Sequence, residues 1–503
     1  MPGEATRTPA WWRGSDVNDR PNVLLVVLDT ARVDAVEPYG AAGNTPAIAD
    51  LARRGRAVPH AYAPANWTLP SHVSFLAGLL PRASGLRLAM GVPDEMSFNA
   101  ARVAELAPRM LPAVLRAAGW ETRAVSANPW IDPRHGFSHG YDDFVTVTGA
   151  RGHGREFTQS TDPEGLVHRW RRRMHRSREA LRAEVDDGAE HAGRVVREWI
   201  DALDRSKPFF WFVNLLECHS PYAPPRRFAR LGALDRVRAA ADHERYGTLD
   251  AVTLTNCAAL ALPDDVVTRM RRAYAGGVSA VDAWLADTLE ALDVVGALDD
   301  TLVVVISDHG ENLGESGRTG HMLWLDDRLL RVPLVSAGPV DLRAPDVASL
   351  AQLPRLLADA IGLADHPWSE ELGNGVAVAQ SDPAIDPADP RLPAAVAERG
   401  LDDYAVWRLT TPGTMATNGR YKVVREGDDE WLYDLREDPA EAVPVRLDAR
   451  VAIEYGDAIA VLRDAVDAAA PTAAGRVTGL VPAAASPGPD PELAERMRML
   501  GYL

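Results

Sequence analysis

Cysteine is scarce in this chain, since Cys218 and Cys257 are the only two among 503 residues. Neither has a spacing typical of metal binding, and two cysteines do not build a disulfide framework, which fits a reducing compartment. The apolar runs are too short to span a bilayer, and residues 1–20 lack the apolar segment of a secretory signal. We therefore expect a cytoplasmic protein without a membrane span.

Lysine is equally scarce although arginine is abundant, a difference that codon bias explains. Lys207 and Lys422 are the only lysines, so a mechanism that needs active-site lysines has few candidates. Positive charge is outweighed overall, because the formal net charge is −17 at pH 7. A field of that sign repels phosphate backbones, so we expect no nucleic-acid binding. An anionic small molecule is compatible with it, because a bound metal reverses the local sign.

The strongest structural signal is a set of three continuous apolar runs, at residues 23–28, 208–216 and 302–306. Runs of this length are typical of strands that are buried on both faces of a parallel sheet. Each run is followed at once by residues that can bind a metal, namely Asp29, then Glu217 and His219, then Asp308 and His309. Because ligands bind at the carboxyl ends of strands in open α/β sheets, we expect these residues to converge.

Helical patterns lie between these runs, at residues 45–56, 106–118 and 267–292. The alternation of strand and helix predicts an α/β fold with a mostly parallel, doubly wound central sheet and helices on both faces. Farther along, the Asn418-Gly419 pair between two β-rich segments predicts a hairpin. This hairpin indicates a small antiparallel subdomain in the C-terminal part of the chain.

The chain is too long for one hydrophobic core, so we expect a large domain with smaller companions. The predicted units are an N-terminal extension at 1–20, a main domain at 21–395, a small β subdomain at 396–465, and a tail at 466–503. The tail is rich in alanine and proline, and we expect it to end in a short helix. An arginine-rich helical insertion is predicted at about 160–204, and acidic residues that follow its basic run indicate a solvated helix face.

A threonine at a predicted helix start is the first candidate for chemistry. Thr68-Leu69-Pro70-Ser71-His72 lies within the segment 63–78 at such a start. Backbone N–H groups and the positive end of the helix dipole would there stabilise an alkoxide and the charged oxygens of an ester under attack. Taken alone, Thr68 is better explained as a helix cap.

This segment and several others resemble the sulfatase family of the alkaline phosphatase superfamily. The family's C-x-P-x-R signature has the frame T-x-P-S-H here, with Thr68 in the nucleophile position and His72 in place of the arginine. The leading metal-binding aspartate of the family matches Asp29, and its late metal motif matches residues 307–311. Lesser matches occur at residues 128–130, 136–137, 221–222 and 500–503. The chain resembles a variant with threonine in place of the cysteine that forms formylglycine.

The resemblance implies a sulfatase-like catalytic domain at 21–395 with one divalent metal ion. Its ligands would be Asp29, Thr68, Asp308 and His309. An imidazole beside carboxylates favours Mn²⁺ or Zn²⁺ over Ca²⁺, since nitrogen ligation disfavours the harder ion. Such a cation would bring the threonine hydroxyl within reach of deprotonation.

The chain departs from the sulfatase pattern in four features. It lacks the cysteine, the arginine four residues later and the two active-site lysines, whose positions read Asn128 and His321. Formylglycine has a second hydroxyl that expels sulfate from the covalent intermediate, and Thr68 has none, so water or another acceptor must attack. Threonine nucleophiles are usual in superfamily members that act on phosphate esters. We therefore favour phosphate monoesters or diesters as substrates.

Two histidines complete the predicted site. By resemblance, His219 and His321 contact the transferred group or protonate the leaving group as general acids. The alternative is a second metal bound by Glu217, His219 and His321. We assign His72, Asn128 and Glu217 to substrate binding, although a structural role explains His72 and Asn128 equally well.

The predicted function is metal-dependent hydrolysis of an anionic small-molecule phosphate ester with a threonine nucleophile. Three alternatives remain: a sulfatase that acts without formylglycine, a phosphotransferase that passes the group to an alcohol, and a non-catalytic binding protein. The intact ligand set disfavours the last. The sequence determines neither the organic part of the substrate nor the oligomeric state.

Overall fold

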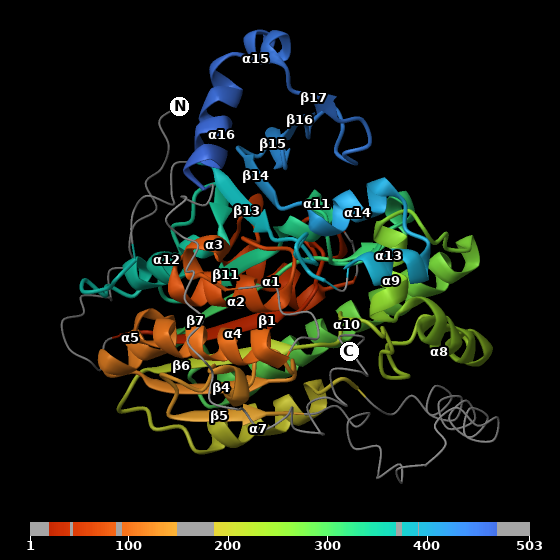
Figure 1. Cartoon of the computed structure of the whole chain (residues 1–503). Coiled ribbons are helices and arrows are strands. Elements are labelled where there is room, and N and C mark those ends of the chain that lie inside the picture. Colours follow the sequence, from red (N-terminus) through yellow and green to blue (C-terminus); the bar gives the residue numbers. More distant parts are fainter. Residues whose placement is uncertain are drawn as a thin grey trace.

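The computed structural model describes residues 20–40, 44–86, 93–147, 186–368, 375–390 and 392–469 (Figure 1). Nearly all of the predicted N-terminal extension, most of the predicted insertion and most of the predicted tail lie outside these residues. The described residues form a mostly parallel sheet with helices on both faces and a smaller antiparallel sheet, which confirms the predicted α/β fold.

The central sheet has seven strands in the order β2-β11-β7-β1-β6-β4-β5. Strands β7, β1, β6, β4 and β5 run parallel, whereas β11 runs antiparallel to β7 and β2. The strands are β1 Asn22–Leu28, β2 Arg56–Ala57, β4 Glu121–Ser126, β5 Asp143–Thr146, β6 Phe209–Leu215, β7 Thr301–Ile306 and β11 Leu334–Ala337. The three predicted apolar runs are therefore neighbours at the centre of one sheet.

Helices cover both faces of this sheet, so that alternate residues of β1 enter two different cores. Val23 and Leu25 pack with one helical layer, and Leu24 and Val26 pack with the other. The first layer contains α2 Thr68–Ala77, α4 Pro93–Leu106, α5 Leu111–Ala117 and α12 Leu353–Ala360, and the second contains α1 Pro46–Arg54, α7 Ala189–Asp201 and α10 Asp264–Val294. Burial on both faces explains why the strand sequences are apolar throughout rather than alternating.

Two helices differ from the sequence expectation. The pattern at 106–118 begins as a separate helix only at Leu111, because Pro108 interrupts the chain after α4. Helix α7 occupies part of the insertion predicted at 160–204, but its Val196 and Trp199 are buried against the central sheet. That part of the chain therefore belongs to the core and does not lie over it.

The second sheet is antiparallel, with strand order β13-β14-β15-β16-β17 (Figure 1). Its elements are β13 Ala377–Ser381, β14 Gly413–Thr417, β15 Tyr421–Glu426, β16 Asp429–Asp434 and β17 Val445–Arg446, with α16 Asp457–Ala468 packed against them. The predicted hairpin turn lies between β14 and β15, where Gly419 has a φ of +83°. Strand β13 belongs to this sheet although it precedes the predicted boundary at 396. The boundary is predicted too late because the pairing of β13 with β14 is non-local and leaves no signal in the local sequence pattern.

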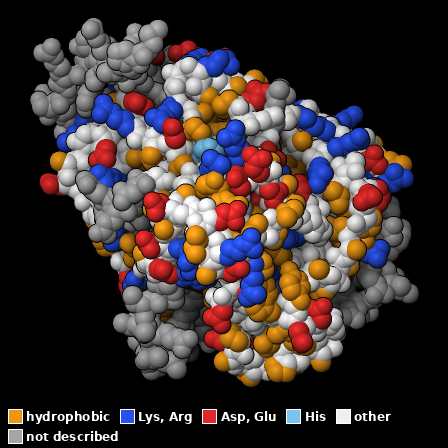
Figure 2. All heavy atoms as spheres, turned by 90° about the horizontal axis from the view of Figure 1, so that it is seen from above, with side chains coloured by type: hydrophobic (Ala, Val, Ile, Leu, Met, Phe, Trp, Pro, Cys, Tyr) orange, Lys and Arg blue, Asp and Glu red, His pale blue; other side chains and the backbone are white. Residues whose placement is uncertain are grey.

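The remaining strands form two small sheets, β10-β3-β12 and β8-β9, and the remaining α-helices lie between these elements in the chain. They are α3 Pro81–Ser84, α8 Ala233–Tyr246, α9 Leu249–Asn256, α11 Asp327–Leu330, α13 Leu392–Arg399, α14 Asp403–Thr410, α15 Ala449–Tyr455, β3 His60–Tyr62, β8 Asn312–Leu313, β9 Thr319–Gly320, β10 Arg331–Val332 and β12 Val347–Ser349. Among the described residues, no helix combines the length and apolar character that crossing a membrane requires. Acidic and basic side chains are interspersed over the face shown in Figure 2.

Candidate metal and catalytic site

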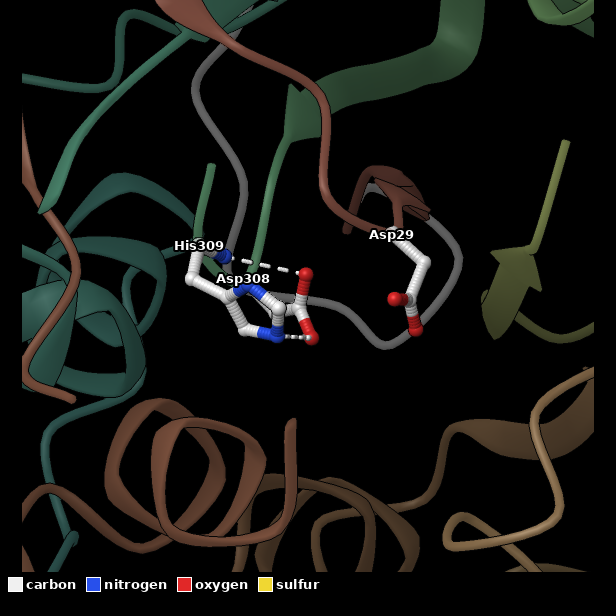
Figure 3. Close-up of side chains that lie close together, drawn as sticks. All are labelled: Asp29, Asp308 and His309. Atoms are coloured by element: carbon white, nitrogen blue, oxygen red, sulfur yellow. Dashed lines mark hydrogen bonds and ion pairs between the residues drawn. The ribbon is translucent and has the colours of Figure 1, made fainter. Parts of the chain in front are cut away.

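The carboxyl edge of the central sheet gathers three metal-capable side chains (Figure 3). Asp29 follows β1, and Asp308 and His309 follow the neighbouring strand β7. One donor atom from each residue lies within 4.8 Å of the others, and all three side chains are fully buried. Of the five strand-end residues expected to converge, these three form one group of donors.

Short contacts bring the supporting segments to this edge. Ser307 donates a hydrogen bond of 2.6 Å to a carbonyl at the end of β1, which joins the ends of β1 and β7. Ser71 of α2 donates one of 2.6 Å to the carbonyl of Asp308. Gly310 is needed because a Cβ at this position would lie 1.9 Å from the carbonyl oxygen of Arg328. The metal-capable turn is thus held by β1, α2 and α11 together.

The charges at this edge are suited to a divalent cation. Asp29 Oδ1 and Asp308 Oδ2 are buried and have no hydrogen-bond partner among the described residues. Burial raises the pKa of Asp29 well above its ordinary value, with a further increase from the charge of Asp308. Burial raises the pKa of Asp308 to about 7. Two buried carboxylates with unpaired oxygens are expensive unless a cation balances them, so the residues present fit a metal ion.

His309 is oriented as a metal ligand would be. Its Nδ1 lies 2.9 Å from the carbonyl oxygen of Gly310, which can only accept, so Nδ1 carries the proton. The unprotonated Nε2 lies 3.3 Å from Asp308 Oδ2. Burial lowers the pKa of His309 to about 4, so the ring is neutral near pH 7. A fixed tautomer with its lone pair directed at the carboxylates is the usual arrangement of a ligating histidine.

Thr68 lies at the first residue of α2, beside the same group. Its Oγ1 is 3.3 Å from His309 Nε2, and the residue is fully buried. The N-cap residue is Trp67, which makes no side-chain capping bond, so Thr68 is not the cap that its sequence context suggested. The first turn of α2 directs its positive end toward the site. The structure therefore places this hydroxyl where the sequence predicted it, next to Asp308 and His309.

Thr30 is a member of the site that sequence reasoning missed. Its backbone N–H donates to Asp308 Oδ1 over 3.1 Å. Its φ of +59° is unusual for a β-branched residue, and such strain costs about 1–3 kcal/mol. Its buried Oγ1 has no hydrogen-bond partner in the described part of the chain. A residue directly after a strand-end aspartate was the available signal, but its conformation was not visible in the sequence.

Asn128 supports Asp29 and does not reach out to a substrate. Its Nδ2 donates to Asp29 Oδ2 over 2.6 Å, and the side chain is fully buried. Asn214 of β6, which the sequence analysis did not select, lies 3.5 Å from the same oxygen through its own Nδ2. The substrate-binding assignment of Asn128 is therefore replaced by a role behind the metal-capable carboxylate. The signal for Asn214 was a single polar residue inside an apolar strand.

His72 is likewise occupied by the protein itself. Its Nδ1 donates to the carbonyl oxygen of Thr68 over 2.9 Å, and its Nε2 accepts from Asn214 over 2.9 Å. Burial lowers the pKa of His72 to about 3, and the side chain is fully buried. With both ring nitrogens used, His72 positions the first turn of α2, and its predicted contact with substrate does not fit this geometry.

A second group of polar side chains lies beside His309. The ring of His321 is 4.4 Å from that of His309 and 5.2 Å from that of His219, measured between centroids. His321 Nδ1 lies 3.1 Å from Oε1 of Glu311, which the sequence analysis quoted within the late motif but did not assign to the site. His219 Nδ1 lies 2.7 Å from the carbonyl oxygen of Ser220. The predicted pair of histidines is thus brought together, with an additional carboxylate.

Glu217 does not join these histidines. Its Oε1 accepts a hydrogen bond of 2.7 Å from the backbone N–H of Ala189, at the start of α7. Burial raises the pKa of Glu217 to about 8, with a further increase from the acidic residues that precede α7. The residues that the structure describes contain one group of metal-capable donors, and it lacks Glu217, His219 and His321. The alternative of a second metal at these three residues is therefore not supported by their positions.

The two lysines of the chain lie away from the site, as their sequence positions indicated. Lys422 of β15 is fully buried and donates to Asp327 over 2.9 Å and to Glu441 over 2.6 Å. Lys207 is exposed before β6. The charge of the site is therefore set by carboxylates and imidazoles.

This is an α/β fold with a candidate metal site at the carboxyl edge of its central sheet. A family model described as "Sulfatase" matches residues 21–365, and the chain belongs to the sulfatase family. A choline-sulfatase of Rhizobium meliloti is 24% identical over 463 residues, which cover 84% of this chain and 81% of that protein. An iduronate 2-sulfatase of Mus musculus is 25% identical over 348 residues, which cover 64% of this chain and 60% of that protein.

Solved structures share the fold at low sequence identity. A phosphonate monoester hydrolase of Agrobacterium radiobacter superposes with a TM-score of 0.57 at 20% identity. The superposition covers 89% of this chain and 96% of that chain. The likeness extends beyond the central sheet to most of the described structure.

Proposed function

We propose that this sulfatase-family hydrolase uses Thr68 as its nucleophile and acts on phosphate monoesters or diesters. The metal ligands in this proposal are Asp29, Thr68, Asp308 and His309. The observation that carries it is the position of Thr68 Oγ1, 3.3 Å from His309 Nε2 at the start of a buried helix. A hydroxyl so placed is next to the oxygen donors and imidazole that a cation would use.

The proposed first step is an in-line attack on phosphorus. Thr68 Oγ1 forms a bond to phosphorus and loses its proton to solvent, while the bond from phosphorus to the leaving oxygen breaks. The leaving oxygen takes up a proton from solvent, because the neutral ring of His219 donates Nδ1–H to the Ser220 carbonyl and has only a lone pair on Nε2. Backbone N–H groups at the start of α2 support the charged oxygens. A bound divalent cation would add charge stabilisation worth several kcal/mol.

We prefer a phosphate ester over a sulfate ester as the substrate because the chain lacks the catalytic residues that sulfate cleavage uses in this family. Thr68 cannot become formylglycine, so the intermediate has no second hydroxyl to expel sulfate. Both lysines of the chain lie elsewhere, and one of them is held by Asp327 and Glu441. Mn²⁺ or Zn²⁺ is our proposal for the metal, since two carboxylates and one imidazole form the donor set.

A sulfate ester is the second candidate, and the relatives favour it. Proteins named choline-sulfatase and iduronate 2-sulfatase are among those similar in sequence. In this case Thr68 would form a sulfate ester that water must cleave directly. A phosphotransferase is the third candidate, in which an alcohol takes the place of water. In each case the substrate is an anionic small molecule, and the cytoplasmic location remains a prediction.

Side-by-side turnover of an aryl phosphate, a bis-aryl phosphate and an aryl sulfate decides among these candidates. We expect the phosphate esters to be cleaved faster, and faster cleavage of the sulfate would replace our preference by the second candidate. Adding glycerol tests the third, because a transferase would form glycerol phosphate in place of inorganic phosphate.

Thr68→Ala tests the nucleophile itself. We expect a loss of roughly 10⁴-fold or more in kcat, comparable with removal of other nucleophiles. Thr68→Ser, which keeps the hydroxyl, is the matched control and should retain measurable activity. Full activity of Thr68→Ala would exclude the proposed nucleophile, whichever ester is the better substrate.

A further inference from the structure

The carboxylate of Glu311 contacts the imidazole of His321 and lies outside the group of metal-capable donors found among the described residues. Its Oε1 lies 3.1 Å from His321 Nδ1, and Glu311 is fully buried. A backbone contact holds the same turn, because Arg32 donates to the carbonyl oxygen of Glu311 over 3.2 Å. The carboxylate therefore occupies a fixed position on one side of the His321 ring.

This contact decides which nitrogen of His321 carries the proton. A carboxylate accepts hydrogen bonds, so Nδ1–H donates to Glu311 and the lone pair of the neutral ring remains on Nε2. The β8–β9 hairpin holds both residues, since Glu311 precedes β8 and His321 follows β9. The pair thus resembles the carboxylate–imidazole arrangement in which a carboxylate fixes the tautomer of a catalytic base.

His321 is also the ring of the site that solvent reaches. Its exposed fraction is 8%, against 2% for His219 and 0% for both His309 and Thr68. The ring lies in contact with His309, which in turn contacts the Thr68 hydroxyl. His321 is therefore the most exposed of these four residues and lies next to the pair formed by His309 and Thr68.

We propose that Glu311 is a positioning residue that holds His321 ready to activate the water that releases the transferred group from Thr68. This proposal rests on the proposed function, because it requires an ester of Thr68. It supplies the step that formylglycine performs with its second hydroxyl in other members of the family. In this chain a water molecule, with His321 as its base, takes the place of that second hydroxyl.

The water oxygen forms a bond to phosphorus while the bond from phosphorus to Thr68 Oγ1 breaks, and one water proton passes to His321 Nε2. The electron pair of the broken bond returns to Oγ1. Oγ1 takes up a proton from solvent and the imidazolium releases one, so that the products are the free threonine hydroxyl and inorganic phosphate, or a phosphate monoester where the substrate is a diester. The same steps written for sulfur release inorganic sulfate.

The decisive experiment separates formation of the Thr68 ester from its hydrolysis in Glu311→Gln. An aryl ester of the class that the enzyme cleaves best reports the first step as release of the aryl alcohol after rapid mixing. Intact mass spectrometry of acid-quenched samples reports the covalent adduct. We expect steady-state turnover to fall about 10²–10⁴-fold, since the amide can donate to Nδ1 and impose the wrong tautomer. Release of the first aryl alcohol should stay within about threefold, so that the adduct accumulates.

A merely structural role gives a different result, because release of the first alcohol and turnover would then fall together without an adduct. Unchanged turnover would also overturn the proposal. Asp359→Asn is the matched control, since it neutralises the carboxylate of another carboxylate–imidazole pair, 3.8 Å from His366 near the end of α12, where the Asp359 side chain is 54% exposed. This variant should leave both steps unchanged.

His321→Ala provides the second variant in case Glu311→Gln does not fold. The His321→Ala protein should accumulate the same adduct. If a folded His321→Ala protein formed no adduct, the proposal would likewise be rejected. Failure of the proposed function looks different. In that case neither the parent nor any variant forms an adduct on the peptide containing Thr68, and Thr68→Ala remains active.

Discussion

Two buried clusters in this chain each contain a pair of carboxylates, and they balance the negative charge in different ways. At the edge of the central sheet, Asp29 and Asp308 face the imidazole of His309. Between α11 and the C-terminal sheet, Lys422 Nζ lies 2.9 Å from Asp327 and 2.6 Å from Glu441. The first cluster lies at the carboxyl ends of parallel strands, and the second joins two parts of the fold.

The difference lies in where the positive charge comes from. Burial lowers the pKa of Lys422, but the neighbouring carboxylates outweigh burial and raise the pKa above its ordinary value, so the lysine is charged. Burial lowers the pKa of His309 to about 4, so the corresponding nitrogen at the sheet edge is neutral near pH 7. A cluster that contains its own cation stabilises the fold, whereas a cluster without one is suited to bind a cation from solution.

Asp308→Asn should give the largest effect, because it removes charge from the cluster that depends on an external cation. We expect kcat/KM to fall on the order of 10³-fold or more, since a bound metal supplies several kcal/mol of transition-state stabilisation. Elemental analysis of the purified variant should show loss of the metal that the parent contains. Added metal should raise the melting temperature of the parent and not that of the variant.

This variant should also leave the metal-free fold intact. Removing one of two buried like charges is expected to make the metal-free protein at least as resistant to urea as the parent. Marked destabilisation of metal-free Asp308→Asn would mean that the sheet-edge carboxylates support the fold as those around Lys422 do. The comparison between the two clusters would then fail.

Lys422→Met should give the opposite outcome. Removing the cation leaves the two neighbouring carboxylates of Asp327 and Glu441 without a balancing charge, which is expected to reduce the free energy of unfolding by about 3–5 kcal/mol. Chemical denaturation measures this loss, and kcat per folded molecule should stay close to that of the parent. Lys207→Met is the matched control, because it removes the other, exposed lysine and should change stability by about 0.5 kcal/mol or less. Equal effects of the two substitutions would contradict the structural role of Lys422.

Much of the site could be predicted because its residues directly follow recognisable strands. Asp29, Asp308 and His309 are next to continuous apolar runs, and parallel strands bring their carboxyl ends to one edge. The direction of a side chain after the strand end is a different matter. Glu217 and His219 both follow β6, yet Glu217 bonds to the start of α7 and only His219 faces His321. Local sequence does not contain that information.

The supporting residues were harder to predict because their partners are distant in the chain. Asn214 occupies an apolar strand and bonds to His72, 142 positions away, and Asn128 bonds to Asp29 across 99 positions. Strand β13 has the same difficulty, since its pairing with β14 crosses a long intervening segment. Periodicity reveals which face of an element is buried, but it does not identify the residue that faces it across the core.

Asn128→Ala should weaken the sheet-edge cluster without abolishing it. Loss of the 2.6 Å hydrogen bond to Asp29 Oδ2 frees the carboxylate to rotate, and such supporting contacts are worth about 10–100-fold in metal affinity. Metal titration of the stripped protein measures the change. Asn22→Ala, at the far end of β1 from the site, is the matched control and should leave metal affinity unchanged. An unchanged affinity for Asn128→Ala would place the asparagine outside the metal support.

Thr30→Gly should give the smallest effect, and it is expected to stabilise the metal-free protein. Thr30 is held at a φ of +59° and its buried hydroxyl is unpaired among the described residues. Glycine relieves about 1–3 kcal/mol of strain and loses roughly 0.5–1 kcal/mol to the greater freedom of its unfolded chain, which leaves a gain of about 1 kcal/mol. Urea denaturation after metal removal measures this gain.

Thr30→Val separates backbone strain from the unpaired hydroxyl as the cause, because it removes the hydroxyl but keeps the branched side chain. An equal gain for both variants would assign the effect to the hydroxyl. Glu441, at a φ of +53° in the other cluster, offers no such gain, since its carboxylate binds Lys422.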